Sequence, residues 1–115
     1  MRPIRISYDP DGDTLYITFG QPASATGYQL SDQILVRMNP GTGEAAGLTI
    51  FNFSAHAGAG EDILLPGLEE DVEVKARLMP ALVSPPIASF LRITEDQRGV
   101  KAVLLSPSLR EAVAV

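Results

Sequence analysis

The sequence contains no cysteine and a single histidine among its 115 residues. The absence of cysteine excludes disulfide bonds, thiolate zinc sites and cysteine nucleophiles, and it fits a reducing compartment. One imidazole, that of His56, does not hold zinc tightly without further ligands from elsewhere. The sequence therefore predicts no metal site and no cofactor.

Long apolar runs and clusters of positive charge are also missing. Apolar runs extend over only a few residues, whereas a membrane helix needs about 20, and polar residues interrupt the opening segment as they would not in a signal peptide. The nine lysines and arginines are scattered in a chain of net charge −5, so the cluster that displaces counterions from nucleic acid is absent. We expect a soluble, cytoplasmic protein that binds neither nucleic acid nor membrane.

The chain is long enough for one domain with a substantial core. Its 115 residues are 45% hydrophobic, and domains most often contain about 100–150 residues. Glycine is concentrated before residue 60, and residues 54–60 have the composition of a connector. We predict a single domain, 1–115, in which 1–54 form a β-meander and 61–115 form a C-terminal extension.

The clearest local signal is a hairpin at the start of the chain. Apolar and polar residues alternate over 4–8 and again over 15–19, as in half-buried strands. Between them lies Asp9-Pro10-Asp11-Gly12-Asp13, in which proline sets φ for a turn and Gly12 accepts a positive φ. The pattern predicts a β-hairpin with a loop of about three to five residues.

Three more strands follow in the N-terminal half, over about 26–30, 34–39 and 47–53. Pro40-Gly41 suits the central positions of a type II turn between the last two. In the last strand Leu48 and Ile50 oppose Thr49, Phe51 and Phe53, so both faces carry apolar bulk. We expect that strand inside the sheet or in a subunit contact.

The C-terminal half is more ambiguous. Residues 68–79 alternate as in a strand, yet Leu68, Val72, Ala76 and Met79 also fit one helical face; the β-branched valines favour the strand. A short helix is expected over about 85–92, a strand over 100–105 after a turn at 95–99, and a final short helix beginning at 106 or 108. The predicted class is α+β, a mainly antiparallel sheet with an extension of one or two strands and short helices.

No catalytic motif accompanies these elements. Asp9, Asp11 and Asp13 are spaced like calcium ligands, but glycine occupies the fourth position instead of the sixth, and Gly20 stands where the bidentate glutamate is required. These aspartates are better explained as turn formers. The acidic run over 69–73 is interpreted as a solvated surface or the first turn of a helix, with contact to a basic partner as the less favoured alternative.

One set of residues supports a rival hypothesis, a small-ligand binding protein or enzyme that uses carboxylates. It would need Asp13, Asp32 or Glu44 to converge with His56 in one pocket, where the imidazole would serve as general base. A structure that shows two or more of these groups in a concave pocket would favour it.

The segment over 6–17, Ile-Ser-Tyr-Asp-Pro-Asp-Gly-Asp-Thr-Leu-Tyr-Ile, resembles the opening of the small bacterial domain-of-unknown-function family 2283. Further matches are Leu-Ser-Asp-Gln-Ile-Leu-Val over 30–36 and Gly-Leu-Thr-Ile over 47–50, although the family usually has glycine in place of Gln33 and an acid in place of Thr49. The similarity covers about 4–54. It implies a bacterial antiparallel meander with no established activity or catalytic residues, and some members resemble companions of small toxin-like proteins.

From these observations we expect a non-enzymatic interaction module that associates with itself. A sheet of five strands has open edges, and a single layer cannot bury two apolar faces. The sequence predicts a homodimer whose interface includes Tyr16, Phe51 or Phe53. The alternative partner is a small toxin-like protein, for which this chain would act as antitoxin.

Overall fold

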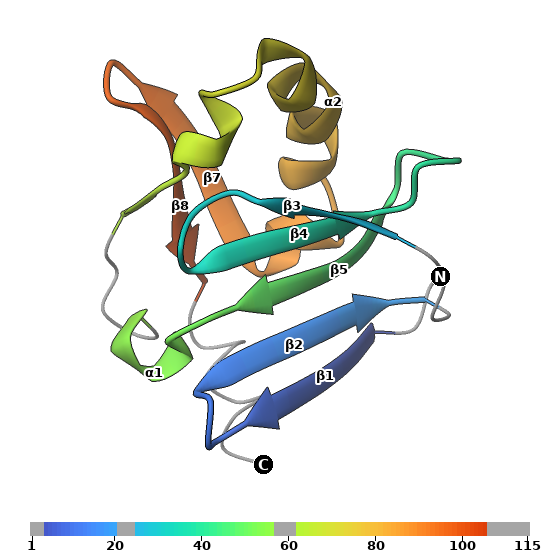
Figure 1. The fold of residues 1–115 in the computed structure, drawn as a ribbon, viewed down its shortest axis with the longest axis vertical. Coiled ribbons are helices and arrows are strands. Elements are labelled where there is room, and N and C mark those ends of the chain that lie inside the picture. Colours follow the sequence, from blue (N-terminus) through green and yellow to red (C-terminus); the bar gives the residue numbers. More distant parts are fainter. Residues whose placement is uncertain (1–3, 21–24, 57–61, 106–115) are drawn as a thin grey trace.

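The computed structural model describes residues 4–20, 25–56 and 62–105 (Figure 1). It contains two antiparallel sheets and one helix of more than four residues, which confirms the predicted α+β class. The elements, in chain order, are β1 (Ile4–Asp9), β2 (Thr14–Phe19), β3 (Thr26–Gln29), β4 (Ile34–Met38), β5 (Ala45–Ile50), α1 (Phe53–His56), β6 (Ile63–Leu64), η1 (Pro66–Leu68), α2 (Val72–Leu82), η2 (Ile87–Ser89), β7 (Leu91–Asp96) and β8 (Gly99–Leu104).

The N-terminal half forms a five-stranded sheet in the order β1-β2-β5-β4-β3. The chain therefore builds a hairpin and a three-stranded meander, and β5 joins them by pairing with β2 on one side and β4 on the other. The central place expected for this strand is confirmed. Its extent is not, because β5 ends at Ile50 and Phe53 begins a helical turn.

One face of this sheet, here called the inner face, carries the core. Leu15 and Ile17 of β2 lie beside Ile50 and Leu48 of β5, and all four are at most 2% exposed. The same hydrophobic cluster includes residues of α2 and of the second sheet, such as Leu78. The extension thus covers the inner face (Figure 1).

The opposite, outer face is mostly polar, contrary to the sequence interpretation that both faces carry apolar bulk. At its centre Thr49 is buried between its cross-strand neighbours Tyr16 and Leu35. Phe53, which the alternating pattern predicts on this face, is instead 2% exposed and belongs to the core. Polar groups on this face can remain hydrated, so no second covering layer is needed.

The two hairpin loops of the sheet have the same construction. Each has four residues after an Asx residue and begins with proline, over 10–13 and 40–43. The side chain of the Asx residue accepts backbone N–H groups: Asp9 from Asp11, and Asn39 from Gly41 and Thr42. In each the last loop residue has a positive φ, 48° at Asp13 and 74° at Gly43. The expected positive φ at Gly12, and that implied at Gly41 by a type II turn, are therefore wrong.

The extension departs furthest from the sequence expectation. The segment over 68–79 is not a strand: helix α2 spans Val72–Leu82, with Asp71 as the N-cap that accepts from the backbone of Glu73 and Val74. The buried residues of α2 are Leu78 and Leu82, whereas Val72, assigned to the alternative helical face, is 80% exposed.

The remainder of the extension is a three-stranded sheet in the order β6-β8-β7. The short helix expected over 85–92 is only the 3-10 turn η2, because Leu91 already begins strand β7. The strand expected over 100–105 is confirmed as β8, which ends at Leu104. The final helix expected from 106 or 108 lies outside the described residues.

Candidate functional site

Asp13 organises one end of the five-stranded sheet. From its left-handed position its carboxylate accepts the Tyr8 hydroxyl at 2.6 Å, and it accepts the hydroxyl and the backbone N–H of Ser54 at 2.6 and 3.1 Å. Its carbonyl oxygen accepts the N–H of Phe53 at 2.9 Å. A single aspartate therefore fastens α1 to the β1–β2 loop.

These contacts explain two changes in acidity. The donors from Ser54 and then Tyr8 hold the pKa of Asp13 below its usual value, because they stabilise the charged carboxylate. The hydrogen bond that the Tyr8 hydroxyl donates to Asp13, together with burial, raises the pKa of Tyr8. A carboxylate whose lone pairs are occupied in this way is a structural acceptor and a poor general base.

The stability contributed by Asp13 should depend on pH. Because its pKa is lowered by folding, its contribution is present above the pKa of the unfolded chain, about 4, and is lost as pH falls through the folded value. Asp13→Asn should lower the thermal midpoint at pH 7, since an amide cannot replace the second acceptor oxygen, yet asparagine tolerates the positive φ. The difference from wild type should shrink toward pH 2.

The matched control is Asp11→Asn in the same loop, because the side chain of Asp11 makes no hydrogen bond within the described part of the chain. Its thermal midpoint should stay close to that of wild type throughout. If the thermal midpoint of Asp13→Asn lies below that of wild type by the same amount at pH 7 and at pH 2, the charge of Asp13 does not stabilise the fold.

The four groups of the carboxylate hypothesis do not meet in one groove. Asp13 adjoins the start of α1, which contains His56, although the side chain of His56 lies outside the described part of the chain. Asp32 lies in the β3–β4 turn and lines a groove without the other three. Glu44 precedes β5, at the opposite end of the sheet, and lines another groove with Arg77.

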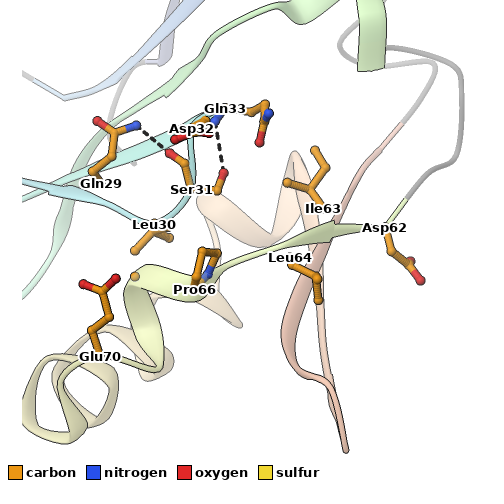
Figure 2. Close-up of a pocket in the computed structure, with 11 residues that line it drawn as sticks. Gln29, Leu30, Ser31, Asp32, Gln33, Asp62, Ile63, Leu64, Pro66 and Glu70 are labelled. Atoms are coloured by element: carbon orange, nitrogen blue, oxygen red, sulfur yellow. Dashed lines mark hydrogen bonds between the residues drawn. The ribbon is translucent and has the colours of Figure 1, made fainter.

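The groove that contains Asp32 has a volume of about 610 Å³ and separates the β3–β4 turn from β6 and η1 (Figure 2). One wall is stiffened by Ser31, whose carbonyl accepts the Gln29 amide at 2.6 Å and whose hydroxyl accepts the N–H of Gln33 at 3.1 Å. The floor is narrow because Gly67 donates its N–H to the Leu30 carbonyl at 2.9 Å.

The carboxylates that line this groove do not form a catalytic pair. Figure 2 shows Glu70 and Asp62 at opposite ends, and Asp62 accepts from Lys101 at 3.1 Å. Lys101 also contacts Asp96 at 2.8 Å, and the two carboxylates raise its pKa, Asp96 more strongly than Asp62. Within 4–20, 25–56 and 62–105, no three acidic or histidine side chains are placed to hold a metal ion.

The acidic run over 69–73 has structural roles. Asp71 caps α2, and Glu69 accepts the N–H of Val100 at 3.2 Å and lies 3.9 Å from Lys75. Lys75 also binds Glu95 of β7, which raises the pKa of the lysine. These contacts support the interpretation that the run forms the start of a helix.

Two isoleucines of β1 are exposed although they lie on the face of the sheet that carries the core. Ile4 and Ile6 share the inner face with Phe19 and Ile17, their cross-strand partners, yet they are 47% and 38% exposed while those partners are 2% exposed. The covering layers formed by the described residues therefore stop short of β1. The period-2 pattern identified β1 as a strand, but nothing in it distinguishes an edge strand from a central one.

The three predicted interface residues lie in different environments. Tyr16 is 44% exposed on the outer face, next to Ser7 of β1. Phe51 is half-buried, and its N–H donates to the Gln33 carbonyl at 2.8 Å. Phe53 is enclosed in the core, with its ring 6.1 Å from that of Tyr8 in an edge arrangement.

Residues 5–54 match the model of the family described as "Protein of unknown function (DUF2283)". The resemblance inferred from the hairpin and its flanking motifs is thereby confirmed, and it extends from β1 through β5 to Ser54 in α1. The extension, with α2 and the second sheet, lies outside the matched segment. Neither the comparison with curated proteins nor that with solved structures found a match, and the description of the family names no activity.

Proposed function

We propose that this protein is a non-enzymatic interaction module that associates with a second copy of itself. The observation that carries the proposal is the place of β1 at the edge of the sheet that the described residues form, where its isoleucines remain exposed on the face that is buried elsewhere in the sheet. An unpaired strand edge offers a row of backbone donors and acceptors, and proteins cover or pair such edges.

The other edge of the sheet is less suited to this role. β3 has four residues, and its only large apolar side chain, Tyr28, is partly buried. β1 has six residues. If a partner covered its exposed isoleucines, the burial of each would stabilise the complex by roughly 1 kcal/mol. Tyr16 lies beside β1 on the outer face, opposite to the face of the isoleucines, whereas Phe53 is in the core and unavailable to a partner.

The carboxylate chemistry of the rival hypothesis has less support. Asp13 is occupied by Tyr8 and Ser54, and Asp32 and Glu44 line separate grooves. The cysteine-free composition fits a reducing compartment, and together with the family resemblance it leads us to place the module in a bacterial cytoplasm. Among the helices that the described residues form, none is long and apolar enough to cross a membrane.

Light scattering at tens of micromolar protein tests the proposal. The wild-type chain, 12.3 kDa as a monomer, is expected to show twice that mass, and Ile6→Lys should return it to the monomer because a charge would occupy the apolar side of the edge. Val72→Lys is the control, since this 80% exposed valine lies on α2 and tolerates the same charge.

A wild-type monomer at these concentrations would refute self-association. A dimer that persists in Ile6→Lys would place the interface elsewhere. Circular dichroism should show that both lysine variants keep the fold, so that a change in mass reports the interface.

A further inference from the structure

The side chains of β1 divide cleanly between the two faces of the sheet. Ile4, Ile6 and Tyr8 lie on the inner face with their partners on β2, and the intervening Arg5, Ser7 and Asp9 lie on the outer face. Because β1 is at the edge of the described sheet, alternate residues direct N–H and C=O groups toward solvent.

The outer-face residues form a charge pattern that is complementary to itself. Arg5 and Asp9 are both exposed and stand two positions on either side of Ser7. Within the described part of the chain Arg5 makes no ion pair, and the carboxylate of Asp9 accepts only the nearby N–H of Asp11. Both charges therefore remain available to a partner.

We infer that β1 pairs antiparallel with β1 of a second copy, with the two-fold axis at Ser7. This inference rests on the proposed self-association and specifies its geometry. Each Arg5 lies opposite the partner's Asp9, so the symmetry forms the ion pair twice, and the two five-stranded sheets become one continuous sheet.

Other positions of the two-fold axis along β1 can be excluded. Continuity of the inner face across the axis requires that inner-face residues oppose inner-face residues, so the axis must coincide with a residue of β1. An axis at Ile6 would place Arg5 opposite the partner's Ser7. An axis at Tyr8 would place Asp9 opposite the partner's Ser7. A parallel arrangement would set Arg5 against the partner's Arg5, which is repulsive. Only the axis at Ser7 gives both charges an opposite partner.

The same register covers one of the two exposed isoleucines, Ile6. Ile6 lies opposite the partner's Tyr8 on the inner face, an aromatic and β-branched pair of the kind that stabilises sheets. On the outer face Tyr16 flanks Ser7 across the β1–β2 ladder. The small serine at the axis leaves room for the two tyrosines on either side.

The absence of cysteine from the chain makes a direct test possible. In an antiparallel pair, directly opposed residues have Cα atoms about 4.5–5.5 Å apart, within the range that a disulfide spans. Ser7→Cys should therefore form a disulfide-linked dimer under mild oxidation, seen on a non-reducing gel and reversed by reductant.

Arg5→Cys is the matched control, on the same strand and face. Its two introduced thiols would be offset by four positions, about 13 Å along the strands, and should remain unlinked under the same conditions. Equal cross-linking of both variants would overturn the register, because it would reflect collision or a different pairing.

Light scattering on the wild-type chain separates this inference from the proposed function. A dimer whose Ser7→Cys variant does not cross-link would overturn the register and leave self-association standing. A monomer would overturn both.

Charge reversal gives an independent check. Arg5→Asp places like charges opposite each other twice and should raise the dimer dissociation constant about tenfold or more at low salt. The double variant Arg5→Asp with Asp9→Arg restores both pairs and should recover most of the affinity. Failure of the double variant to recover would count against the pairing of Arg5 with the partner's Asp9.

Discussion

Replacement of Gly67 by alanine is expected to destabilise the protein by about 3 kcal/mol, near the upper end of the cost of overpacking. A Cβ atom at this position would lie 2.3 Å from the Gln29 carbonyl oxygen and 3.0 Å from the Cα of Leu30. Both contacts are with backbone, so the clash cannot be relieved by rotation of a side chain. The β3–β4 turn and η1 would have to separate, which would also strain the hydrogen bond from Gly67 to Leu30.

Gly27→Ala provides the control for the Gly67 prediction. Its Cβ would meet only the side chain of Leu35, at 3.6 Å, an ordinary contact. The free energy of unfolding, measured in urea, should change little or increase, because alanine restricts the unfolded chain more than glycine does. Equal stabilities for the two variants would contradict the close approach of η1 to the sheet.

Phe53→Ala should cost about 3–5 kcal/mol, the usual effect of removing a buried aromatic side chain. Phe53 is 2% exposed, and its ring packs against Tyr8 at the end of the sheet that Asp13 organises. The variant would leave a cavity beneath the β1–β2 loop. Urea unfolding monitored by circular dichroism measures the loss.

Phe51→Ala is the paired control, two residues earlier and half-buried. Its cost should be clearly smaller, because part of that ring already contacts solvent. A larger loss for Phe51→Ala than for Phe53→Ala would contradict the enclosure of Phe53 in the core.

The strands and loops of the N-terminal half were predictable because their signals are local. Alternation with a period of two residues follows directly from strand geometry, and β1, β2 and β4 are found within a residue of their expected positions. Asp9-Pro10 and Asn39-Pro40 correctly marked the two turns. The residue with positive φ was misplaced, because it depends on loop length: a four-residue loop puts the left-handed position last, at Asp13 and Gly43.

Helix α2 shows where local signals failed. Its sequence alternates over 72–78, which favours a strand, but Val74, Leu78 and Leu82 also recur with the spacing of four residues that a helix requires. The deciding factors were the cap at Asp71 and the burial of Leu78 and Leu82 in the core, where tertiary packing outweighs the strand preference of valine.

The sequence by itself determined the family resemblance, the strand pattern and the absence of a recognised catalytic motif, because these depend on residues close together in the chain. The tertiary structure alone decided which apolar residues are enclosed and which are exposed. Insertion of β5 between β2 and β4 leaves β1 at the edge, so Ile4 and Ile6 stay exposed although their pattern matches that of β2. The helical turn after β5 carries Phe53 into the core. Burial is set by what lies across a face, and that depends on contacts between residues distant in the chain.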